Sequence, residues 1–504
     1  MTLDHSYKNC LAVGMLSSFL VILIFGSFQC FAQSDRIISS QELQQDFWVY
    51  RKSLEEAHPG LYWYKTKTQM DSIFDSAREQ LDQPMSERNF FSLLSWTTAR
   101  IGCLHTYMKG SKAFEKANIN PEARPFPFDI IIDQDRMFIH HNLSNDLSIP
   151  DGVAITSING QETSLLIRFL TERIPNDGFG DHWSRYVLER SFRYFYHVLL
   201  GASESFEITL KNVGGKEWAA TAPGRLEKER SKIIRERYPN SVLEDPVISL
   251  KFDEQTNSAI LRVTRFDNWK IGKKKYKFRK VLKEKMKEVL ASEVANLVLD
   301  VGDHGGGNEL WGLELLSYFL DEPYTAYQAV EFKTFNYDIS KKYSSTSWLE
   351  MNLVKLILNF EKSDSTINWK NYKGVKPYPP RKQQFKGNLY LLIGGSTASA
   401  TSDFAAWVKE LDLATIVGTE TGGSYLGNTS NWEFMIELPQ TKLRLHLPLA
   451  RYLINGETKE LGRGVIPDYI VPTTTQDKLN DIDTQLKYTL QLIRNNTSAG
   501  VLTK

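Results

Sequence analysis

Short apolar runs alternate with amphipathic stretches from Val247 onward, and this alternation constrains the fold more than any other feature of the sequence. The apolar runs have the length of strands, and the amphipathic stretches place their apolar residues at helical spacing. Strands and helices in this order predict an α/β layer architecture. We expect strands at Ile260 to Val263, Leu297 to Val301, Leu389 to Ile393, Thr415 to Val417 and Leu443 to Leu447, and helices at Phe278 to Leu290, Glu309 to Phe319 and Asp403 to Leu411.

The rest of the 504-residue chain divides into regions of different pattern, so the sequence predicts a multi-domain α+β protein. A region with helical periodicity is followed by a small β-rich module, and a polar, charged segment then reads as a linker. The predicted boundaries are 1–32 for an export signal, 33–115 for the helical N-terminal module, 116–225 for the β-rich module, 226–246 for the linker, 247–480 for the α/β domain and 481–504 for a C-terminal helix and tail.

The first 32 residues have the pattern of an export signal. Lys8 lies in a short polar start, an apolar stretch runs from Leu11 to Phe28, and Ala32 precedes the expected cleavage point. We therefore expect a periplasmic or extracellular protein with no stable membrane span once the signal is removed. The alternatives are an uncleaved anchor, for which the apolar stretch is short, and lipidation at Cys30. After cleavage Cys103 is the one remaining cysteine, so no internal disulfide is expected.

Charge and histidine spacing exclude several classes of function. The chain has 61 basic and 60 acidic residues, so no global field attracts nucleic acid or an anionic membrane. The nine histidines show no metal-ligand spacing. His140 and His141 are neighbours on a predicted strand and are expected to point to opposite faces. We expect no metal and no cofactor.

A candidate nucleophile lies between the apolar run Leu389 to Ile393 and the amphipathic stretch that follows it. Between them, Gly395 to Phe404 predicts a tight turn of small residues that opens a helix. A serine in such a turn is presented where free backbone N–H groups and the helix dipole stabilise an oxyanion. Ser399 is therefore the candidate. The alternative is that the serines and threonines of this turn only cap the helix.

A second turn of this kind follows the run Leu297 to Val301, where the segment Gly302 to Asn308 is rich in glycine and precedes a predicted helix. Such a turn exposes successive N–H groups, which bind a phosphate or donate to an oxyanion. The Gly-Lys-Ser/Thr of a P-loop is absent, and the GxGxxG spacing is not met. Two such turns in one α/β domain suit acyl transfer, which needs both a nucleophile and N–H donors.

Four segments of the chain resemble, in order, motifs of the C-terminal-processing and tricorn-core family of serine peptidases. They are Gly102 to Thr106, Ile149 to Gly160, Asp300 to Gly307 and Thr397 to Phe404. The resemblance covers nearly the whole mature chain. It implies a crotonase-like α/β catalytic domain, a helical N-terminal module and a PDZ-like module in the β-rich region. It also implies a peptide or protein substrate, gripped by its chain end through β-augmentation.

The resemblance implies which residues activate the nucleophile. One branch of the family uses a lysine after a later loop, but Ser424 occupies that position here. The other branch uses a histidine from the N-terminal side, and His105 matches it. The resemblance therefore implies that Ser399 attacks the substrate carbonyl and that His105 accepts its proton.

The remaining site residues follow from the same resemblance. The N–H groups of Ala400 and of Gly305 or Gly306 would hold the oxyanion. A carboxylate orients the histidine in a triad, and Glu460 and Glu420 are the two candidates.

Several positions depart from the family pattern near the reacting centre. Gly302 stands in place of Arg, His304 in place of Asn, Cys103-Leu104 in place of Asp-Gly, and Ser402 in place of an acidic residue. These departures leave open a catalytically impaired homologue that binds peptides, and they make His304 an alternative base. An esterase-like acyl hydrolase also stays open, since a nucleophile and an oxyanion hole do not define the leaving group. The sequence leaves the oligomeric state open.

Overall fold

The computed structural model describes residues 36–118, 122–242, 246–271, 273–345, 359–363, 366–457 and 460–498. The predicted export signal at 1–32 lies outside the described residues. In the part of the chain that is described, no helix is both long enough and apolar enough to cross a membrane.

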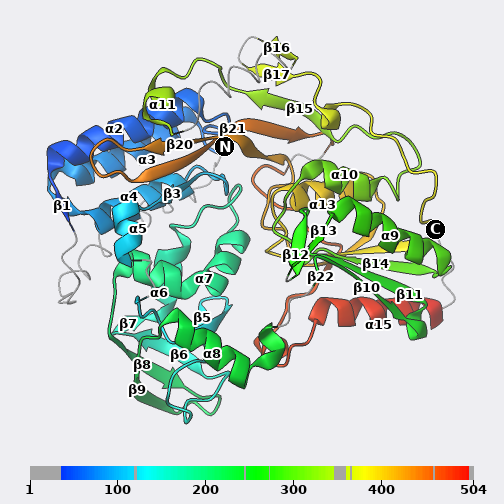
Figure 1. Cartoon of the computed structure of the whole chain (residues 1–504), viewed down its shortest axis with the longest axis horizontal. Helices are drawn as coiled ribbons and strands as arrows, with labels where there is room; N and C mark the ends of the chain where they lie inside the picture. Colours follow the sequence, from blue (N-terminus) through cyan, green and yellow to red (C-terminus); the bar gives the residue numbers. More distant parts are fainter. Residues whose placement is uncertain are drawn as a thin grey trace, which may run out of the picture. The chain divides into compact units, whose positions relative to one another are not determined.

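A six-stranded sheet forms the centre of the α/β region (Figure 1). Its order is β10-β11-β14-β18-β19-β22, and all neighbouring strands run parallel except β10 and β11. Parallel neighbours require long crossover connections, which here contain the predicted helices. The strands are β10 (Ile248–Asp253), β11 (Ser258–Val263), β14 (Asn296–Asp300), β18 (Asn388–Ile393), β19 (Thr415–Gly418) and β22 (Tyr469–Ile470).

Helices cover both faces of this sheet, which explains the nearly continuous apolar character of its strands. One face packs against α9 (Phe278–Ala291), α10 (Glu309–Leu316) and α13 (Ala400–Glu410), and the other against α15 (Thr484–Ser498) (Figure 1). Side chains alternate accordingly along β14. Leu297 and Leu299 join the core under α10 and α13, whereas Val298 packs with Ile493 of α15.

A second, antiparallel sheet has the order β16-β17-β15-β21-β20, and β3 (Tyr107–Lys109) also pairs with β21. The run Leu443 to Leu447, expected in the α/β layer, lies mostly in β21 and so belongs to this sheet instead. An apolar run indicates a strand but does not reveal its partner, which is why this expectation was wrong. The other strands are β16 (Phe360–Lys362), β17 (Ile367–Trp369), β15 (Tyr327–Phe332), β20 (Gly427–Glu437) and β21 (Arg444–Ile454).

The N-terminal region forms the predicted helices, α2 (Ser40–Ala57), α3 (Lys67–Glu79) and α4 (Glu87–Ala99). Capping boxes begin the first two, and α2 ends two residues before Pro59. Helix α2 is attached to the turn between β20 and β21, because the buried carboxylate of Asp46 accepts hydrogen bonds from the amides of Gln440 and Thr441 and from the Thr441 hydroxyl. Together with the β3–β21 pairing, this contact joins the helical region to the second sheet.

The β-rich region forms a third sheet of order β4-β5-β6-β8-β9, in which β7 (Gln161–Glu162) pairs with β6. The prediction that His140 and His141 point to opposite faces is wrong, since their rings stack with centroids 4.0 Å apart. The register between β4 and β5 shifts here, and an extra residue in one strand re-aims its side chains. The other strands are β4 (Phe128–Asp133), β5 (Arg136–Asn142), β6 (Ala154–Ile158), β8 (Ser205–Lys211) and β9 (Glu217–Pro223).

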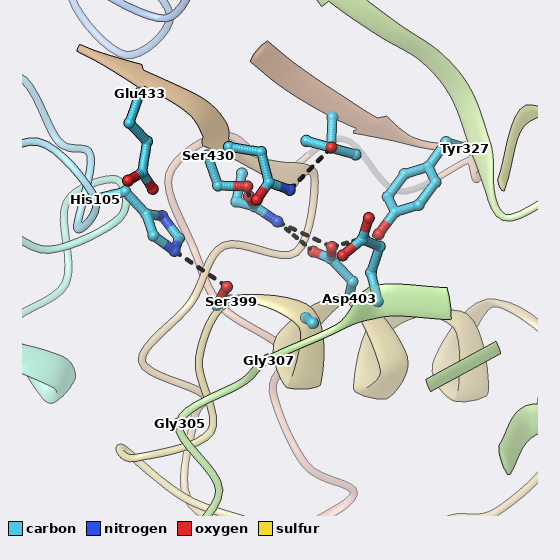
Figure 2. A pocket seen from close by; sticks show the side chains of 13 residues that line it. His105, Gly305, Gly307, Tyr327, Ser399, Asp403, Ser430 and Glu433 are labelled. Atoms are coloured by element: carbon cyan, nitrogen blue, oxygen red, sulfur yellow. Dashed lines mark hydrogen bonds between the residues drawn. The ribbon is translucent and has the colours of Figure 1, made fainter. Parts of the chain in front are cut away.

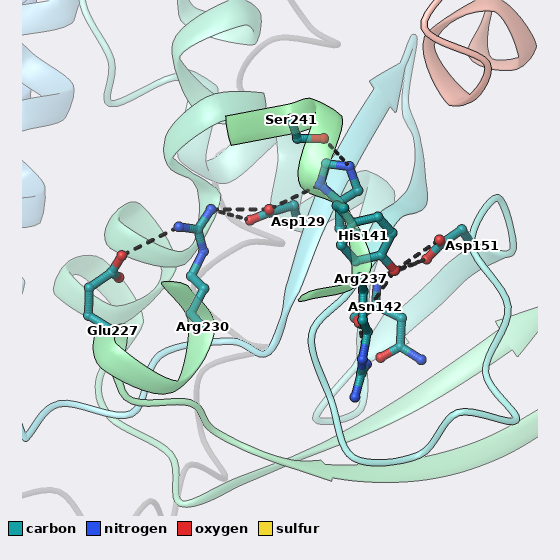
Figure 3. Close-up of polar contacts among 9 residues, drawn as sticks. Asp129, His141, Asn142, Asp151, Glu227, Arg230, Arg237 and Ser241 are labelled. Carbon is teal, nitrogen blue, oxygen red and sulfur yellow. Dashed lines mark hydrogen bonds and ion pairs between the residues drawn. The ribbon is translucent and has the colours of Figure 1, made fainter. Parts of the chain in front are cut away.

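Helix α8 (Glu227–Arg237) lies in the segment predicted as a linker, and polar contacts fasten it and the residues after it to the third sheet (Figure 3). Arg230 pairs with Asp129 at 3.0 Å, and Tyr238 donates to Asp151 at 2.9 Å. The sequence predicts a linker here, but Arg230 and Arg237 bind residues of the third sheet.

Candidate active site

Ser399 lies in the turn between β18 and α13, as the sequence predicts. Its backbone has φ 53° and ψ −133°, a conformation that residues other than glycine rarely adopt. Neighbouring contacts hold this turn: the Ser402 hydroxyl donates to the Ser399 carbonyl at 2.7 Å, and the Gly423 amide donates to the Thr397 carbonyl at 3.1 Å. A strained turn of this kind, held from both sides, presents its side chain away from the sheet.

The glycine-rich loop between β14 and α10 packs directly on this serine. A Cβ on Gly306 would lie 2.7 Å from the Ser399 Cβ, and the φ of Gly306 is +111°, so glycine is required there. The two turns are also tied by hydrogen bonds, since Thr397 Oγ1 donates to the Val301 carbonyl at 3.0 Å and the Ser396 hydroxyl donates to the Gly302 carbonyl.

The three amides predicted as oxyanion donors differ in whether they already have an acceptor among the described residues. The amides of Gly305 and Ala400, which both line the cavity, donate to no acceptor among the described residues. The Gly306 amide instead donates to His304 Nδ1 at 3.0 Å, within the loop itself. Gly307 lines the same cavity as Gly305. Of the two loop amides predicted as alternatives, that of Gly305 is therefore the one available to a ligand.

His304 is built into the scaffold of the loop. Its side chain is fully buried against Phe266, with ring centroids 4.3 Å apart, and Nδ1 accepts from the Gly306 amide and the Thr401 hydroxyl. Burial lowers the pKa of His304 to about 3, so the ring is neutral. It makes no hydrogen bond to Ser399 among the described contacts, and so the structure does not place His304 as a base for this hydroxyl.

His105 lies beside Ser399, although 294 positions separate the two residues in the chain (Figure 2). The distance from His105 Nε2 to Ser399 Oγ is 3.0 Å. His105 occupies a turn just before β3. The turn is held by the Leu104 amide, which donates to Asp177 at 2.9 Å, and by Thr106, whose hydroxyl lies 2.8 Å from His58 Nε2.

The surroundings of His105 favour its neutral form. Burial of the ring and the nearby charge of His446 lower the pKa of His105 to about 4, and the carboxylate of Glu433 opposes this shift. Since Nε2 faces a hydroxyl, the neutral ring that accepts from Ser399 carries its proton on Nδ1. Nδ1 is buried and has no hydrogen-bond partner among the described residues, although the Thr429 carbonyl is close enough to favour its proton.

The two carboxylates predicted to orient His105 have other partners in the described contacts. Glu420 accepts from Arg463 Nε at 2.9 Å and from the Gly464 amide at 2.8 Å. Burial would raise the pKa of Glu420, but these bonds and His182 outweigh it and lower that pKa to about 2. Glu460 is exposed, and its carbonyl accepts from the Arg463 amide at 3.4 Å. Neither contacts His105.

The carboxylate beside His105 belongs to Glu433 of β20, which sequence reasoning missed together with His446 of β21 (Figure 2). His446 Nε2 lies 2.7 Å from Glu433 Oε2, and His446 Nδ1 lies 2.7 Å from the carbonyl oxygen of His105. Their spacing in the sequence is that of any polar pair on a hairpin. The pairing of β3 with β21 brings Glu433 and His446 next to His105. No local sequence pattern predicts that pairing.

A cavity of about 290 Å³ opens next to Ser399 and His105 (Figure 2). Its walls are polar and include three carboxylates. One of them, Asp403, is buried and accepts from Tyr327 at 2.7 Å and from Asn428 at 2.9 Å. Burial raises the pKa of Asp403 to about 7 despite these bonds. The lining residues are His105, Gly305, Gly307, Glu309, Tyr327, Ser399, Ala400, Asp403, Asn428, Ser430, Asn431, Glu433 and Tyr452.

Comparison with known proteins confirms the family resemblance. Residues 257–471 match the model of peptidase family S41. The fold is similar to a crystal structure of mature CPAF, at 13% identity, with a TM-score of 0.61 over 91% of this chain and 97% of that chain. It is equally similar to a structure of mature CPAF complexed with lactacystin, at 14% identity, with a TM-score of 0.61 over 91% of this chain and 98% of that chain. At these identities the likeness establishes a shared mixed α/β, multi-sheet fold.

Proposed function

Because this chain belongs to peptidase family S41 through residues 257–471, we propose that it is a serine endopeptidase in which Ser399 is the nucleophile and His105 the general base. The observation that carries the proposal is the 3.0 Å contact between His105 Nε2 and Ser399 Oγ, at a turn that neighbouring residues hold in a strained conformation. Capping alone needs neither a histidine partner nor strain.

The proposed reaction uses groups already in place. His105 takes the proton of Ser399 as the hydroxyl oxygen attacks the peptide carbonyl carbon. The N–H groups of Gly305 and Ala400 stabilise the negative oxygen of the tetrahedral intermediate. His105 then gives the proton to the leaving amine, and water, activated by the same ring, hydrolyses the acyl-enzyme and frees Ser399.

The proposal assigns roles to the regions of the chain. The crotonase-like catalytic domain spans 247–480, the helical N-terminal module 33–115 delivers His105, and a PDZ-like module at 116–225 binds the substrate chain end by β-augmentation. The signal at 1–32 directs export to the periplasm or the outside of the cell.

The departures from the family pattern do not leave gaps in the site, and this favours an active enzyme over an inactive peptide-binding homologue. His304 accepts two hydrogen bonds inside the loop, and Ser402 donates to the carbonyl of the nucleophile. The Ser424 hydroxyl, at the position of the missing lysine, accepts from the Leu426 amide at 3.2 Å. His304 and Ser402 thus support the two turns on which the position of Ser399 depends.

Cleavage of an unfolded protein tests the proposal. We expect the purified chain to fragment a reduced and alkylated protein, and we expect Ser399→Ala to lower kcat/KM at least about 10⁴-fold. Ser292→Ala is the matched control, because Ser292 lies at the C-terminal end of α9 and its hydroxyl donates only to the Val289 carbonyl in the described contacts. No cleavage by the native chain, with retained binding of the same protein, would support the peptide-binding alternative. Turnover of small esters but not of peptides would support the esterase.

A further inference from the structure

We propose that His446 is a positioning residue for this reaction: as a doubly protonated imidazolium, it holds the backbone of His105 and sets the carboxylate of Glu433 beside the His105 ring. The inference rests on the proposed function in one respect, because it takes His105 to be the general base. The protonation state of His446 itself can be measured without any activity.

His446 lies where the N-terminal module meets the second sheet. It is on β21, opposite Tyr107 of β3 on one side and Met435 of β20 on the other. Its side chain is 9% exposed, and its ring stacks on that of Tyr107 with centroids 4.5 Å apart and an interplanar angle of 11°. Packing therefore fixes the ring plane, and with it the direction of both ring nitrogens.

The two hydrogen bonds of His446 identify its protonation state. Nδ1 lies 2.7 Å from the carbonyl oxygen of His105, and a carbonyl oxygen can only accept. Nε2 lies 2.7 Å from Glu433 Oε2, and the bond to His446 lowers the pKa of Glu433, which is therefore an ionised acceptor. A neutral imidazole has one N–H, so it would direct a lone pair at one of these oxygens. The imidazolium donates to both.

His446 and Glu433 act on His105 in two ways: His446 holds its backbone, and the charges of both shift the pKa of its ring. His446 fixes the carbonyl of the same residue whose side chain reaches Ser399, while Asp177 holds the preceding amide, that of Leu104. A base whose backbone is held on both sides in this way needs little reorganisation in order to react. The positive charge of His446 keeps His105 neutral before the reaction, and the Glu433 carboxylate stabilises the positive ring that forms during it.

The charged and titratable groups that act on this pair come from three strands and the turn before them. Lys109 of β3 acts on Glu433 of β20, Tyr107 of β3 stacks on His446 of β21, and His105 of the turn faces both members. Removing the charge of either His446 or Glu433 therefore shifts the pKa of His105. The direction of the shift follows from the sign of the charge that is removed.

The first test measures the protonation state of the His446 ring directly. In the full-length Ser399→Ala protein, which cannot turn over, we expect ¹⁵N NMR to show both ring nitrogens of His446 protonated in the folded resting state. His446→Gln keeps a donor for the His105 carbonyl but removes the positive charge, and it should raise the pKa of His105 by about one unit. Glu433→Gln removes the negative charge and should lower that pKa. His140→Gln is the control, since His140 lies in the third sheet and should leave His105 unchanged.

The second test is kinetic. The acid limb of kcat/KM should move to higher pH in His446→Gln and to lower pH in Glu433→Gln, by about one unit each. In His446→Gln kcat should fall about 10-fold while KM changes little, because His446 does not line the cavity. A loss of folding alone would lower activity without moving the acid limb of kcat/KM. His446→Phe keeps the stacking on Tyr107, so it separates the effect of the lost charge from that of lost packing.

Different results would overturn this inference and the proposed function. A single protonated ring nitrogen on His446, or an unmoved pKa of His105 in both charge-removing variants, would overturn the inference even if the native chain cleaves peptides. Failure of the native chain to cleave would instead count against the proposed function, and the NMR titrations would still decide the role of His446.

Discussion

The ring of His105 has to meet two opposed requirements. It must be neutral to accept a proton from Ser399, and it must tolerate the positive charge that this proton brings. Burial of the ring, followed by the charge of His446, lowers the pKa of His105 to about 4, and Glu433 supplies the compensating carboxylate. The resting base is therefore neutral across the neutral pH range and over much of the acid range.

The pH dependence of the rate follows from this value. Protonated His105 cannot accept the proton of Ser399, so activity should rise as pH increases through about 4 and stay level through neutrality. A profile of kcat/KM from pH 3 to 8 checks this. An acid limb near 6.5, the value of an unperturbed histidine, would mean that the ring is not buried as described. A profile with no acid limb would remove His105 from the role of base.

At the scale of elements, sequence reasoning succeeded where the information is local. Strand, turn and helix follow one another without interruption at 296–316 and again at 388–410, so the local pattern predicts both turns and their helices. The family resemblance, and not the local pattern, implied the amides of Ala400 and of Gly305 or Gly306 as oxyanion donors. The use of the Gly306 amide by His304 was not predictable, because it depends on how the loop folds back on itself.

Contacts between distant elements were not predictable in this way. A family motif, and not periodicity, predicts His105, and the two carboxylates predicted to orient it, Glu420 and Glu460, have other partners. The actual neighbours, Glu433 and His446, lie on a hairpin whose alternating pattern indicates only a strand pair. Their relation to His105 exists because β3 adds to the edge of that pair.

At the scale of the whole molecule, the site depends on how the helical N-terminal region is attached to the second sheet. One part of the attachment is the β3–β21 pairing, and the other is Asp46, which is fully buried and accepts three hydrogen bonds from Gln440 and Thr441 at 2.6 to 2.8 Å. Both contacts involve the β20–β21 hairpin, which also carries Glu433 and His446. The histidine and its carboxylate are thus positioned by a single junction.

Substitution of Asp46 tests this junction. Asp46→Ala removes the acceptor of three donors, two of which are buried, so we expect the free energy of unfolding to fall by about 3 kcal/mol. We also expect kcat to fall at temperatures where the variant is still folded, because His105 is held less firmly. Denaturant unfolding and peptide cleavage measure the two effects. Asp82→Ala, an exposed carboxylate of the same helical region, should change stability by less than about 0.5 kcal/mol. Equal stability of the two variants would contradict this account of the junction.

The central claim is that folding joins a histidine of the early region to a serine of the late one, and phosphonylation of the native chain by a fluorophosphonate measures this most directly. Site mapping by mass spectrometry should find one adduct, on Ser399, and the rate of its formation should fall about 10²- to 10⁴-fold in His105→Gln. An adduct on another residue while Ser399 stays unmodified, or an equal rate in His105→Gln, would contradict the claim.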